Sequence, residues 1–377
     1  MRKIIICGNY GATNLGDEAI LAGILELFRR LDPERLTNVA KIIILSTNPN
    51  NTTALHGVES LPLVPAGLRS LIRALFKGSI IKTLNAIRNC DGFILGGGGL
   101  FNDEKPLSIL IWGLQAHVAL LFRKPLMCLG QSVGPLNNFF SRQIVKSIYA
   151  RCRVVTVRDI NSQKLLRSLN LPVPKVVADP AFLLHMSEPA SAKREQIVVL
   201  SVRSWHKNMP SKADKIFAQF IETNYSKYGL RTVMVPFSLY PENDSILLDK
   251  IFAQIKDKAA AEVFEFSNDF TKVLALIKKA TVVVGMRLHS LIFATLTATP
   301  FLALSYSDKV SSYARELEMD DYALPLTALS EKTLSEKFNL LMSNYERVKG
   351  HIIEKNLLNR ASAAKNIDEI KLFIDSL

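Results

Sequence analysis

The sequence predicts an α/β protein built from two doubly wound, Rossmann-like parallel sheets. Short β-branched runs alternate with helical patterns through the first half of the chain, as in a parallel sheet covered by helices. The alternation stops at a polar, proline-bearing segment, residues 185–195, and then starts again. The 377 residues are enough for two domains with separate cores. We therefore expect an N-terminal domain over residues 1–187, a C-terminal domain over 188–329 and a charged helical tail over 330–377.

The expected strands can be read directly from the apolar runs. In the N-terminal domain they are KIIIC, KIIIL, GFILGGGG, PLMCLG and RVVTV. In the C-terminal domain they are QIVVLSVR, RTVMVPF, EVFEF, ATVVVG and PFLALSY, with helices around residues 211–227, 244–257, 269–279 and 288–297. Two such domains are expected to leave a cleft between them, and their ligands bind at the carboxyl ends of the strands. The loops that follow strands are therefore the places to search.

The composition is that of a folded protein, with 48% hydrophobic and 21% charged residues. The first apolar run, residues 4–7, is too short for a signal peptide. No segment reaches the roughly 18 uninterrupted apolar residues of a membrane span, so we expect a cytoplasmic protein. The cysteines have no paired spacing, and we expect them to be reduced packing residues. They are Cys7, Cys90, Cys128 and Cys152.

The chain is basic, with 47 lysines and arginines against 34 aspartates and glutamates and a formal charge of +13. This surplus favours an anionic partner. We find no nucleic-acid recognition motif and no interleaving of aromatic and basic residues, so no nucleic acid is expected. Phosphorylated metabolites and anionic lipid remain as partners.

One basic segment is a candidate for contact with a membrane surface. No acid occurs between Glu59 and Asp91, and on a helix Arg69, Arg73 and Lys77 would share one face opposite a row of apolar residues. An interfacial helix has this pattern. An ordinary surface helix that covers a sheet has it too, and both interpretations stay open.

Two glycine-rich loops follow expected strands of the N-terminal domain. In GNYGATNLGDEAI, Gly11 permits a tight turn, and Asn14 and Asp17 can cap the next helix. The spacing is neither that of a dinucleotide fingerprint nor that of a P-loop. In ILGGGGLFND, Gly97 and Gly98 belong to a run of four glycines. Such a run either lets a ligand approach the backbone or forms a structural turn, and its place at the carboxyl end of a strand favours the ligand.

Three further loops carry polar residues just past a strand. Gln131 is the second residue of GQSVGP, which we expect to line the same cleft as the glycine loops. Arg158 follows RVVTV and either pairs locally or serves the site. Arg203 takes the corresponding place in the C-terminal domain, with His206 and Lys207 just behind it, and could bind an anion there.

The segment VVVGMRLHSLIFA combines the strongest site signals. Three valines form a buried strand, a glycine makes the turn, and Arg287 and His289 then lie at the start of a helix. A helix N-terminus favours anions, an arginine binds carboxylate or phosphate with a planar fork, and a histidine exchanges protons near neutral pH. Lys309 follows the next strand. We expect these three residues to form a catalytic anion site.

Eight segments together resemble the polysaccharide pyruvyl transferase family, and most closely its CsaB-like branch, which acts in S-layer anchoring. They are GNYGATNLGDEAILAGIL, ILGGGGLF, GQSVGPL, VRDINS, ADPAF, LSVRSW, GMRLHSLIFA and SYSDKV, and they run in family order along the chain. The resemblance implies a pair of Rossmann-like domains arranged as in GT-B glycosyltransferases. It also implies transfer of pyruvate from phosphoenolpyruvate to two hydroxyls of a sugar as a cyclic ketal, with no metal or nucleotide cofactor.

The resemblance assigns roles to individual residues. His289 matches the catalytic histidine, Arg287 the arginine of the R-x-H motif, and Lys309 the lysine of a loop that usually reads DPKV and here reads SDKV. Either Arg158 or Arg203 completes the donor site. The glycine loops of the first domain would receive the acceptor, for which the family suggests N-acetylmannosamine on a polyprenyl carrier at the inner face of the cell membrane.

Two other functions are compatible with the same sequence. A nucleotide-sugar-dependent glycosyltransferase can use the same architecture, because such scaffolds host many chemistries. A peripheral membrane assembly protein could keep the fold without activity. Consumption of phosphoenolpyruvate rather than a nucleotide sugar, and its loss in a His289→Ala variant, distinguish the three.

Overall fold

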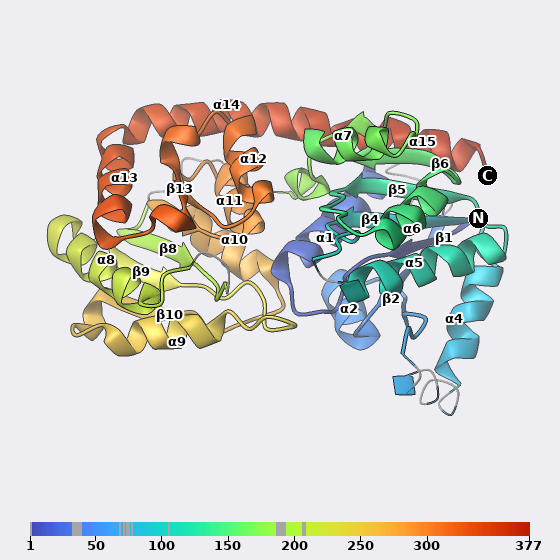
Figure 1. The fold of residues 1–377 in the computed structure, drawn as a ribbon, viewed down its shortest axis with the longest axis horizontal. Helices are drawn as coiled ribbons and strands as arrows, with labels where there is room; N and C mark the ends of the chain where they lie inside the picture. The colour runs from blue at the N-terminus through green and yellow to red at the C-terminus, as the bar shows by residue number, and fades with distance from the viewer. Residues whose placement is uncertain are drawn as a thin grey trace. The chain divides into compact units, whose positions relative to one another are not determined.

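The computed structural model describes residues 2–31, 40–67, 69, 70, 72, 76, 78–104, 106–185, 194–205 and 209–377. The chain forms two compact units. The first comprises Met1–Ala12, Asp17–Leu184 and Asn359–Leu377, and the second comprises Thr13–Gly16 and His185–Leu358. Each unit holds one parallel sheet with helices, which confirms the predicted α/β class (Figure 1).

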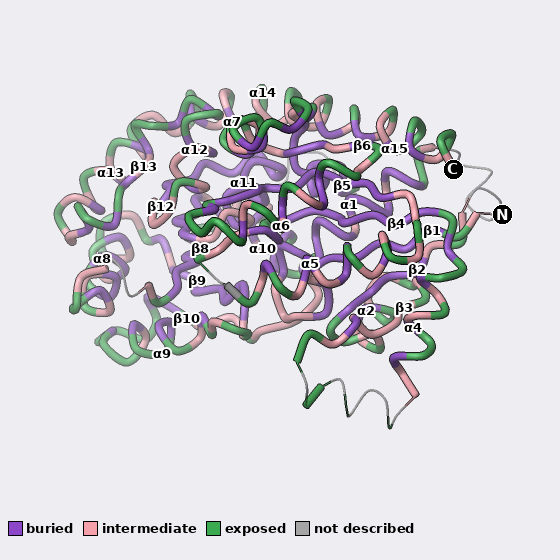
Figure 2. The backbone as a smooth tube through the Cα atoms, turned by 45° about the vertical axis from the view of Figure 1, so that its right-hand side comes forward, coloured by how far each residue is buried: buried purple, intermediate pink, exposed green. Residues whose placement is uncertain are grey.

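The first unit holds a seven-stranded sheet in the order β3-β2-β1-β4-β5-β6-β7, and every neighbouring pair is parallel. Its strands are β1 (Arg2–Cys7), β2 (Ala40–Ser46), β3 (Ser60–Pro62), β4 (Gly92–Gly98), β5 (Leu126–Gln131), β6 (Cys152–Val157) and β7 (Lys175–Val176). The central strands β4 and β5 are buried along their whole length, as the purple tube in Figure 2 shows. Burial on both faces explains why they read as continuous apolar runs.

The helices of the first unit follow its strands, except for the C-terminal helix α15. They are α1 (Leu15–Leu31), α2 (Pro49–His56), α4 (Ser79–Arg88), α5 (Pro106–Leu121), α6 (Phe139–Tyr149), α7 (Ile160–Ser168) and α15 (Asn366–Asp375). Trp112 of α5 and Ile148 of α6 pack in one core cluster with the sheet residues Leu95 and Leu126. Because both helices follow parallel strands, their first turns lie at the carboxyl edge of the sheet.

The second unit holds a six-stranded sheet in the order β10-β9-β8-β11-β12-β13, again with parallel neighbours throughout. Its strands are β8 (Ile197–Ser201), β9 (Arg231–Met234), β10 (Ala261–Val263), β11 (Val282–Gly285), β12 (Phe301–Ser305) and β13 (Ala323–Pro325). Strands β8 and β11 are buried at every residue. They form the centre on which the loops described below are built.

Helices of the second unit are α8 (Ala213–Tyr228), α9 (Ser245–Gln254), α10 (Phe270–Lys279), α11 (Leu288–Leu296), α12 (Asp308–Glu316) and α13 (Glu331–Ser343). A longer helix, α14 (Tyr345–Ala364), contains the division between the two units. Helix α11 is buried from Ser290 to its end. The first turn of α11, in contrast, is only partly buried and carries the site residues.

The division into units differs from the predicted boundaries at one place, because the N-terminal segment Thr13–Gly16 groups with the second unit. The tail over 330–377, which we expect to pack across the domains, is divided between the units after Leu358. The predicted linker lies mostly outside the described residues, which omit 186–193. Strands β3, β7 and β13 were not predicted, because their two or three residues, SLP, KV and ALP, show no run of β-branched or aromatic residues.

The described residues include no helix that is both long and apolar enough to cross a membrane. All four cysteines carry free thiols, and Cys7, Cys90 and Cys128 are buried. The sulfur atoms of Cys128 and Cys152 lie 3.4 Å apart. Burial raises the pKa of the Cys90 thiol to about 11 and moves that of Cys7 further in the same direction.

Candidate active site

Four loops meet at the carboxyl edge of the second sheet. Strands β9, β8, β11 and β12 lie next to one another in this order, and because they are parallel, the loops that follow them leave the same edge. Their polar and aromatic residues are Glu242 and Asp244 after β9, Arg203 and Trp205 after β8, Arg287 and His289 after β11, and Tyr306 and Lys309 after β12. Three of the residues predicted from sequence as a catalytic anion site, Arg287, His289 and Lys309, are thus on neighbouring loops, with Arg203 beside them.

Asp244 holds the side chain of Arg287 in one orientation. Its Oδ1 accepts a hydrogen bond from Nη2 of Arg287 at 2.5 Å, and its Oδ2 accepts one from Nε at 3.1 Å. The same Oδ2 accepts from the backbone N–H groups of Phe237 and Ser238, at 3.0 and 3.1 Å. Asp244 is fully buried. Two parallel bonds to one carboxylate leave the guanidinium little freedom to rotate.

Arg287 keeps its charge in this surrounding. Burial lowers the pKa of its guanidinium, but attraction and hydrogen bonding to Asp244 raise it, and Tyr306 and Glu242 add smaller increases. The net pKa of Arg287 lies above its ordinary value. Arg287 is therefore a permanent cation at the first turn of α11.

Arg203 is linked to Arg287 through Glu242. An Oε2 atom of Glu242 forms an ion pair with Nη2 of Arg203 and lies 3.8 Å from Nη1 of Arg287. The Arg203 guanidinium also lies over two aromatic rings, 5.0 Å from the centre of Trp205 and 5.5 Å from that of Tyr306. Both arginines are nearly buried, whereas a third of the Glu242 side chain is exposed. One partly exposed carboxylate thus lies between two fixed cations.

His289 packs directly against Gly16. The segment Thr13–Gly16 belongs to the same unit as His289. A Cβ atom placed on Gly16 would lie 2.0 Å from Nδ1 of His289, far inside any permitted contact. Only glycine at position 16 leaves room for the imidazole in this position, which gives that residue a role the sequence interpretation did not assign.

Backbone contacts keep this N-terminal segment in place. The N–H of Leu15 donates to the carbonyl of Phe237 at 3.0 Å, and Asn14 forms an isolated antiparallel bridge with Ser238. The side chain of Asn14 accepts a hydrogen bond from the N–H of Gly16 at 3.0 Å. Asn14, expected to bind substrate, therefore caps the start of α1 and supports the glycine beside His289.

Two helix N-termini at this edge lack a side-chain cap. Arg287 and Ser307 precede α11 and α12, and neither makes a capping hydrogen bond. Lys309 is the second residue of α12 and is partly buried. The first-turn N–H groups of such helices attract anions. Two N-termini and Lys309 thus favour an anion at this edge, where Arg203 and Arg287 are already paired with Glu242 and Asp244, and Asp308 lies in the first turn of α12.

Several buried polar atoms at the same edge have no hydrogen-bond partner among the described residues. They are Oγ of Ser201, Nε of Arg203, Oγ of Ser305 and Oγ of Ser307. All belong to residues at or just beyond the ends of β8 and β12. Leaving a buried donor without a partner costs roughly 1–3 kcal/mol, so these groups are suited to a ligand with several acceptor oxygens.

The glycine run of the first unit has a structural explanation. Gly97 and Gly98 have φ angles of +58° and +76°. A Cβ at Gly97 would lie 1.9 Å from Cγ2 of Ile20, and one at Gly98 would lie 2.9 Å from Oδ1 of Asp17. The close neighbour is therefore α1 of the protein itself, and the expectation that a ligand requires these glycines gains no support here.

The loop containing Gly11 is held from within the first unit. Gly11 has a φ of +74°, and its N–H donates to Oε1 of Glu18 at 2.7 Å. The other oxygen of Glu18 pairs with Nε2 of His56 at 2.7 Å. Asp17 lies in the first turn of α1 rather than at its cap, where it accepts from the side chain of Asn9 at 2.7 Å.

Gln131 and Arg158 are both engaged within the first unit. Gln131 is fully buried, donates to the carbonyl of Leu95 at 3.0 Å and accepts from the hydroxyl of Tyr149 at 2.6 Å. Its amide is thus not offered to a substrate, contrary to the sequence interpretation. Arg158 pairs with Asp179 at 2.6 Å, and both are nearly buried. Of the two candidate arginines, Arg203 is the one in the same unit as Arg287.

The sequence interpretation missed Glu242 and Asp244. Both follow a predicted strand, and the run YPENDS contains them within three residues. An acidic pair after β9 and arginines after β8 and β11, the next two strands of the sheet, could have suggested ion pairing at the shared edge. His206 and Lys207, named as a further part of the anion site, lie outside the described residues. Across the described ranges, no group of three or more His, Cys, Asp and Glu residues could hold a metal ion.

Comparison with solved structures places the fold in the GT-B-like class. The chain is similar to a Staphylococcus aureus MnaA–UDP co-structure, with a TM-score of 0.67, 12% identity and coverage of 100% of this chain and 98% of the other. It is also similar to UDP-GlcNAc 2-epimerase from Neisseria meningitidis bound to UDP-GlcNAc, with a TM-score of 0.65, 13% identity and full coverage of both chains. Epimerases and glycosyltransferases of this kind share the two-sheet architecture.

Within that class, sequence comparison gives the family. The family model of polysaccharide pyruvyl transferases matches residues 14–308, and the chain belongs to this family. It is 25% identical to the amylovoran biosynthesis protein AmsJ of Erwinia amylovora over 93% of this chain and 94% of that protein. The resemblance to this family noted from the short motifs is thereby confirmed, and a transferase role in polysaccharide biosynthesis is supported.

Proposed function

We propose that the protein transfers pyruvate from phosphoenolpyruvate to two hydroxyls of a cell-wall or surface-polysaccharide sugar, forming a cyclic ketal. The observation that carries the proposal is the grouping of Arg203, Arg287 and Lys309 with His289 on neighbouring loops of the second sheet. Phosphoenolpyruvate bears a phosphate and a carboxylate on one carbon. Several fixed cations near two helix N-termini are suited to bind both groups.

The donor would displace a carboxylate of the protein. Glu242 now lies between Arg203 and Arg287, and its partly exposed position allows it to move. A substrate carboxylate or phosphate would then take the guanidinium contacts that Glu242 makes. Asp244 stays with Arg287, because it is fully buried and bound to the backbone as well.

The proton balance of the reaction suits a single imidazole. Protonation of the donor methylene gives a methyl group and an oxocarbenium-like carbon, which the first sugar hydroxyl attacks. Phosphate leaves, and the second hydroxyl closes the ring. Of the two hydroxyl protons released, one replaces the proton given to the methyl group, and the other leaves with phosphate. His289, at the first turn of α11, is the residue we assign to the proton transfers.

In this proposal the first unit binds the acceptor sugar. The acceptor would be a lipid-linked sugar, such as N-acetylmannosamine on a polyprenyl diphosphate. The enzyme would then work at the inner face of the cell membrane, in the assembly of S-layer anchoring polymers. Phosphoenolpyruvate is a co-substrate, and no metal or nucleotide takes part. The basic segment that begins at Arg69 is one candidate for membrane contact, and Arg69 is exposed. Arg73 and Lys77 lie outside the described residues.

The test combines the protein with phosphoenolpyruvate and a lipid-linked disaccharide that ends in β-linked N-acetylmannosamine. We expect release of phosphate and a mass gain on the sugar equal to pyruvate less one water. A parallel reaction with UDP-sugars tests the competing glycosyltransferase function. We include it because two similar solved structures contain UDP or UDP-GlcNAc. Consumption of the UDP-sugar alone would overturn the proposal. No turnover with either donor would favour an inactive assembly protein.

A further inference from the structure

Helix α5 carries apolar residues on its outward face as well as its inward one. Leu107, Leu110 and Leu121 are 69%, 55% and 76% exposed, and Leu114 on the same face is partly exposed. Their spacing of three, four and seven residues places them along one stripe. A helix that covers a sheet in water normally presents polar residues there. The outward stripe of α5 therefore lacks a partner of matching chemistry within the described structure.

The start of α6 extends this apolar surface. Phe139 and Phe140 are 66% and 74% exposed, and their rings lie 5.9 Å apart in an edge-to-face arrangement. Asp103, in the loop that leads to α5, accepts a hydrogen bond from the N–H of Asn138 at 2.7 Å. This bond joins the approaches to α5 and α6, and Figure 1 shows the two helices side by side. We call the five exposed residues and the groove beside them the α5–α6 face. They are Leu107, Leu110, Leu121, Phe139 and Phe140.

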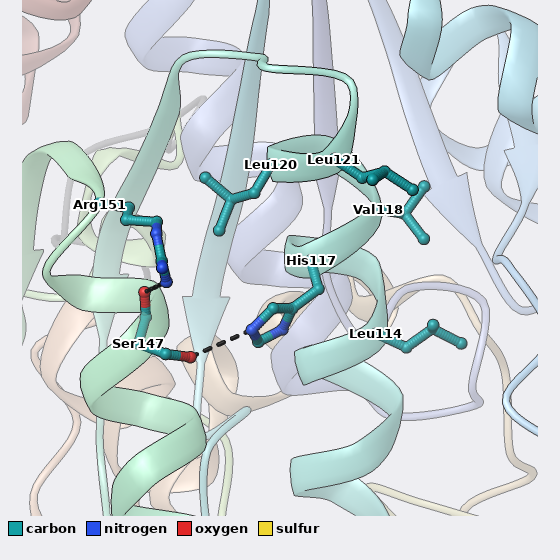
Figure 3. Close-up of a pocket in the computed structure, with 7 residues that line it drawn as sticks. All are labelled: Leu114, His117, Val118, Leu120, Leu121, Ser147 and Arg151. Atoms are coloured by element: carbon teal, nitrogen blue, oxygen red, sulfur yellow. Dashed lines mark hydrogen bonds between the residues drawn. The ribbon is translucent and has the colours of Figure 1, made fainter.

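The groove between the two helices is apolar with a cation at its rim. It has a volume of about 690 Å³ and is lined on the α5 side by leucine and valine side chains and His117. From α6 and its C-terminal turn it receives Ser147 and Arg151 (Figure 3). His117 Nε2 and Ser147 Oγ lie 3.1 Å apart and connect the two helices across the groove.

The surrounding charge is mostly positive. Asp103 and Glu104 immediately precede α5, but from residue 105 to residue 158 the sequence contains no aspartate or glutamate, and neither does α4. Arg123, Lys146 and Arg151 are exposed on or just beyond α5 and α6. Neighbouring α4 adds the exposed Lys82. An exposed apolar face with more cations than acids at its border complements an anionic lipid surface.

We propose that the α5–α6 face docks the protein on an anionic lipid bilayer, with Phe139 and Phe140 inserted among the headgroups. Phe139, Phe140 and Leu107 lie where α5 and α6 begin, at the carboxyl edge of the first sheet, whereas the groove lies toward the C-terminal ends of the two helices. A docked enzyme would thus hold that edge at the level of a lipid-linked sugar.

Vesicle sedimentation without any substrate tests this inference separately from the proposed reaction. We expect wild-type protein to sediment with vesicles of phosphatidylglycerol and phosphatidylcholine, weakly with phosphatidylcholine alone, and less at high salt. The double variant Phe139→Ser, Phe140→Ser should lower the partition coefficient for vesicle binding at least about tenfold. The double variant Lys146→Gln, Arg151→Gln should lower the partition coefficient mainly for anionic vesicles.

Matched controls use exposed residues elsewhere. The apolar control is the double variant Leu357→Gln, Leu358→Gln, which removes two leucines that are 64% and 58% exposed. The charge control is the double variant Lys212→Gln, Lys215→Gln, which removes two exposed cations. Neither should change binding. If the double phenylalanine variant melts early, Phe139→Trp provides a second measurement, with a blue shift of its emission expected on adding anionic vesicles.

Four results would overturn the inference. The first is that wild-type protein does not bind vesicles, and the second is that test and control variants lose binding equally. The third is that the phenylalanine substitutions change only the size of an oligomer in solution. The fourth is that an Arg69/Arg73/Lys77→Gln variant loses all binding while the α5–α6 variants keep it. The last result would assign docking to the basic segment. None of these results bears on whether pyruvate is transferred, because no substrate is present.

Discussion

Asp244 binds Arg287 through two hydrogen bonds of 2.5 and 3.1 Å and is itself fully buried. Since Asp244 also accepts from two backbone N–H groups of its own loop, it fixes the loop after β9 to the loop after β11. The cation at the start of α11 therefore depends on a carboxylate 43 residues earlier in the chain.

Replacing Asp244→Asn should destabilise the protein and impair donor binding. The variant leaves a nearly buried guanidinium without its counter-charge, which typically costs about 3–5 kcal/mol. Chemical denaturation measures this loss, and the KM for phosphoenolpyruvate should rise in parallel. The control is Asp269→Asn, at the cap of α10, where asparagine caps as well as aspartate and the change should stay within about 0.5 kcal/mol. Equal stability of both variants would contradict the role of Asp244.

Replacing Gly16→Ala should lower turnover through His289 while the donor still binds. The new Cβ would lie 2.0 Å from Nδ1 of the imidazole, so the ring must move. A displacement of about 1 Å can cost roughly 100-fold in rate. The kcat for phosphate release and the binding of phosphoenolpyruvate by calorimetry are the two measurements. Gly350→Ala is the control, because a Cβ there meets nothing within 4 Å. Unchanged kcat in the Gly16 variant would show that the ring position is unimportant.

Replacing His289→Gln should lower kcat by about 10² to 10⁴-fold, the usual contribution of a positioned acid or base. Binding of phosphoenolpyruvate should change little, since the cations remain. His351→Gln, on α14, is the matched control and should retain activity. A His289 variant with wild-type kcat would remove this residue from the proton transfers.

Replacing Glu242→Gln should lower the KM for phosphoenolpyruvate, by about 2- to 10-fold, with kcat nearly unchanged. The variant weakens the competitor that now lies between Arg203 and Arg287. A modest effect is expected because the glutamate is partly exposed and its interactions are screened. Glu262→Gln, which breaks an exposed pair with Arg231, is the control. A higher KM in the Glu242 variant would mean that this carboxylate supports donor binding instead of opposing it.

The cysteines should resist alkylation at pH 8 in the folded protein. Burial raises the pKa of Cys90 to about 11 and that of Cys7 also, so the reactive thiolate is scarce below the raised pKa. Mass spectrometry after a short iodoacetamide treatment should find these two unlabelled, and all four cysteines labelled after unfolding. Rapid labelling of Cys7 would place it nearer the surface than the fold does.

The sequence predicts the sheets well because burial on both faces leaves continuous apolar runs. Val282 to Val284 and the run around Ile94 are examples, and both form central strands. Short edge strands such as β7 are not predicted, because two residues are too few to show a hydrophobic periodicity. Arg287, His289 and Lys309 were found because each follows a strong strand signal by only a few residues.

Other parts of the site depend on contacts that spacing does not reveal. Gly16 stands about 270 residues from His289, and its role appears only when the segment Thr13–Gly16 is seen with the second unit. Gln131 is the last residue of β5, close to where site residues lie, but its buried amide is hydrogen-bonded to Leu95 and Tyr149. Position after a strand thus identifies candidates, whereas hydrogen-bond partners decide which of them a substrate can reach.

The most direct test of the proposed reaction is to run it in D₂O with phosphoenolpyruvate and the lipid-linked disaccharide, and to analyse the product by mass spectrometry. We predict one deuterium in the ketal methyl group and one phosphate released for each ketal, because the methylene must be protonated from an exchangeable group. A ketal without deuterium, or a product formed only from a nucleotide sugar, would contradict protonation of the enol at the second sheet.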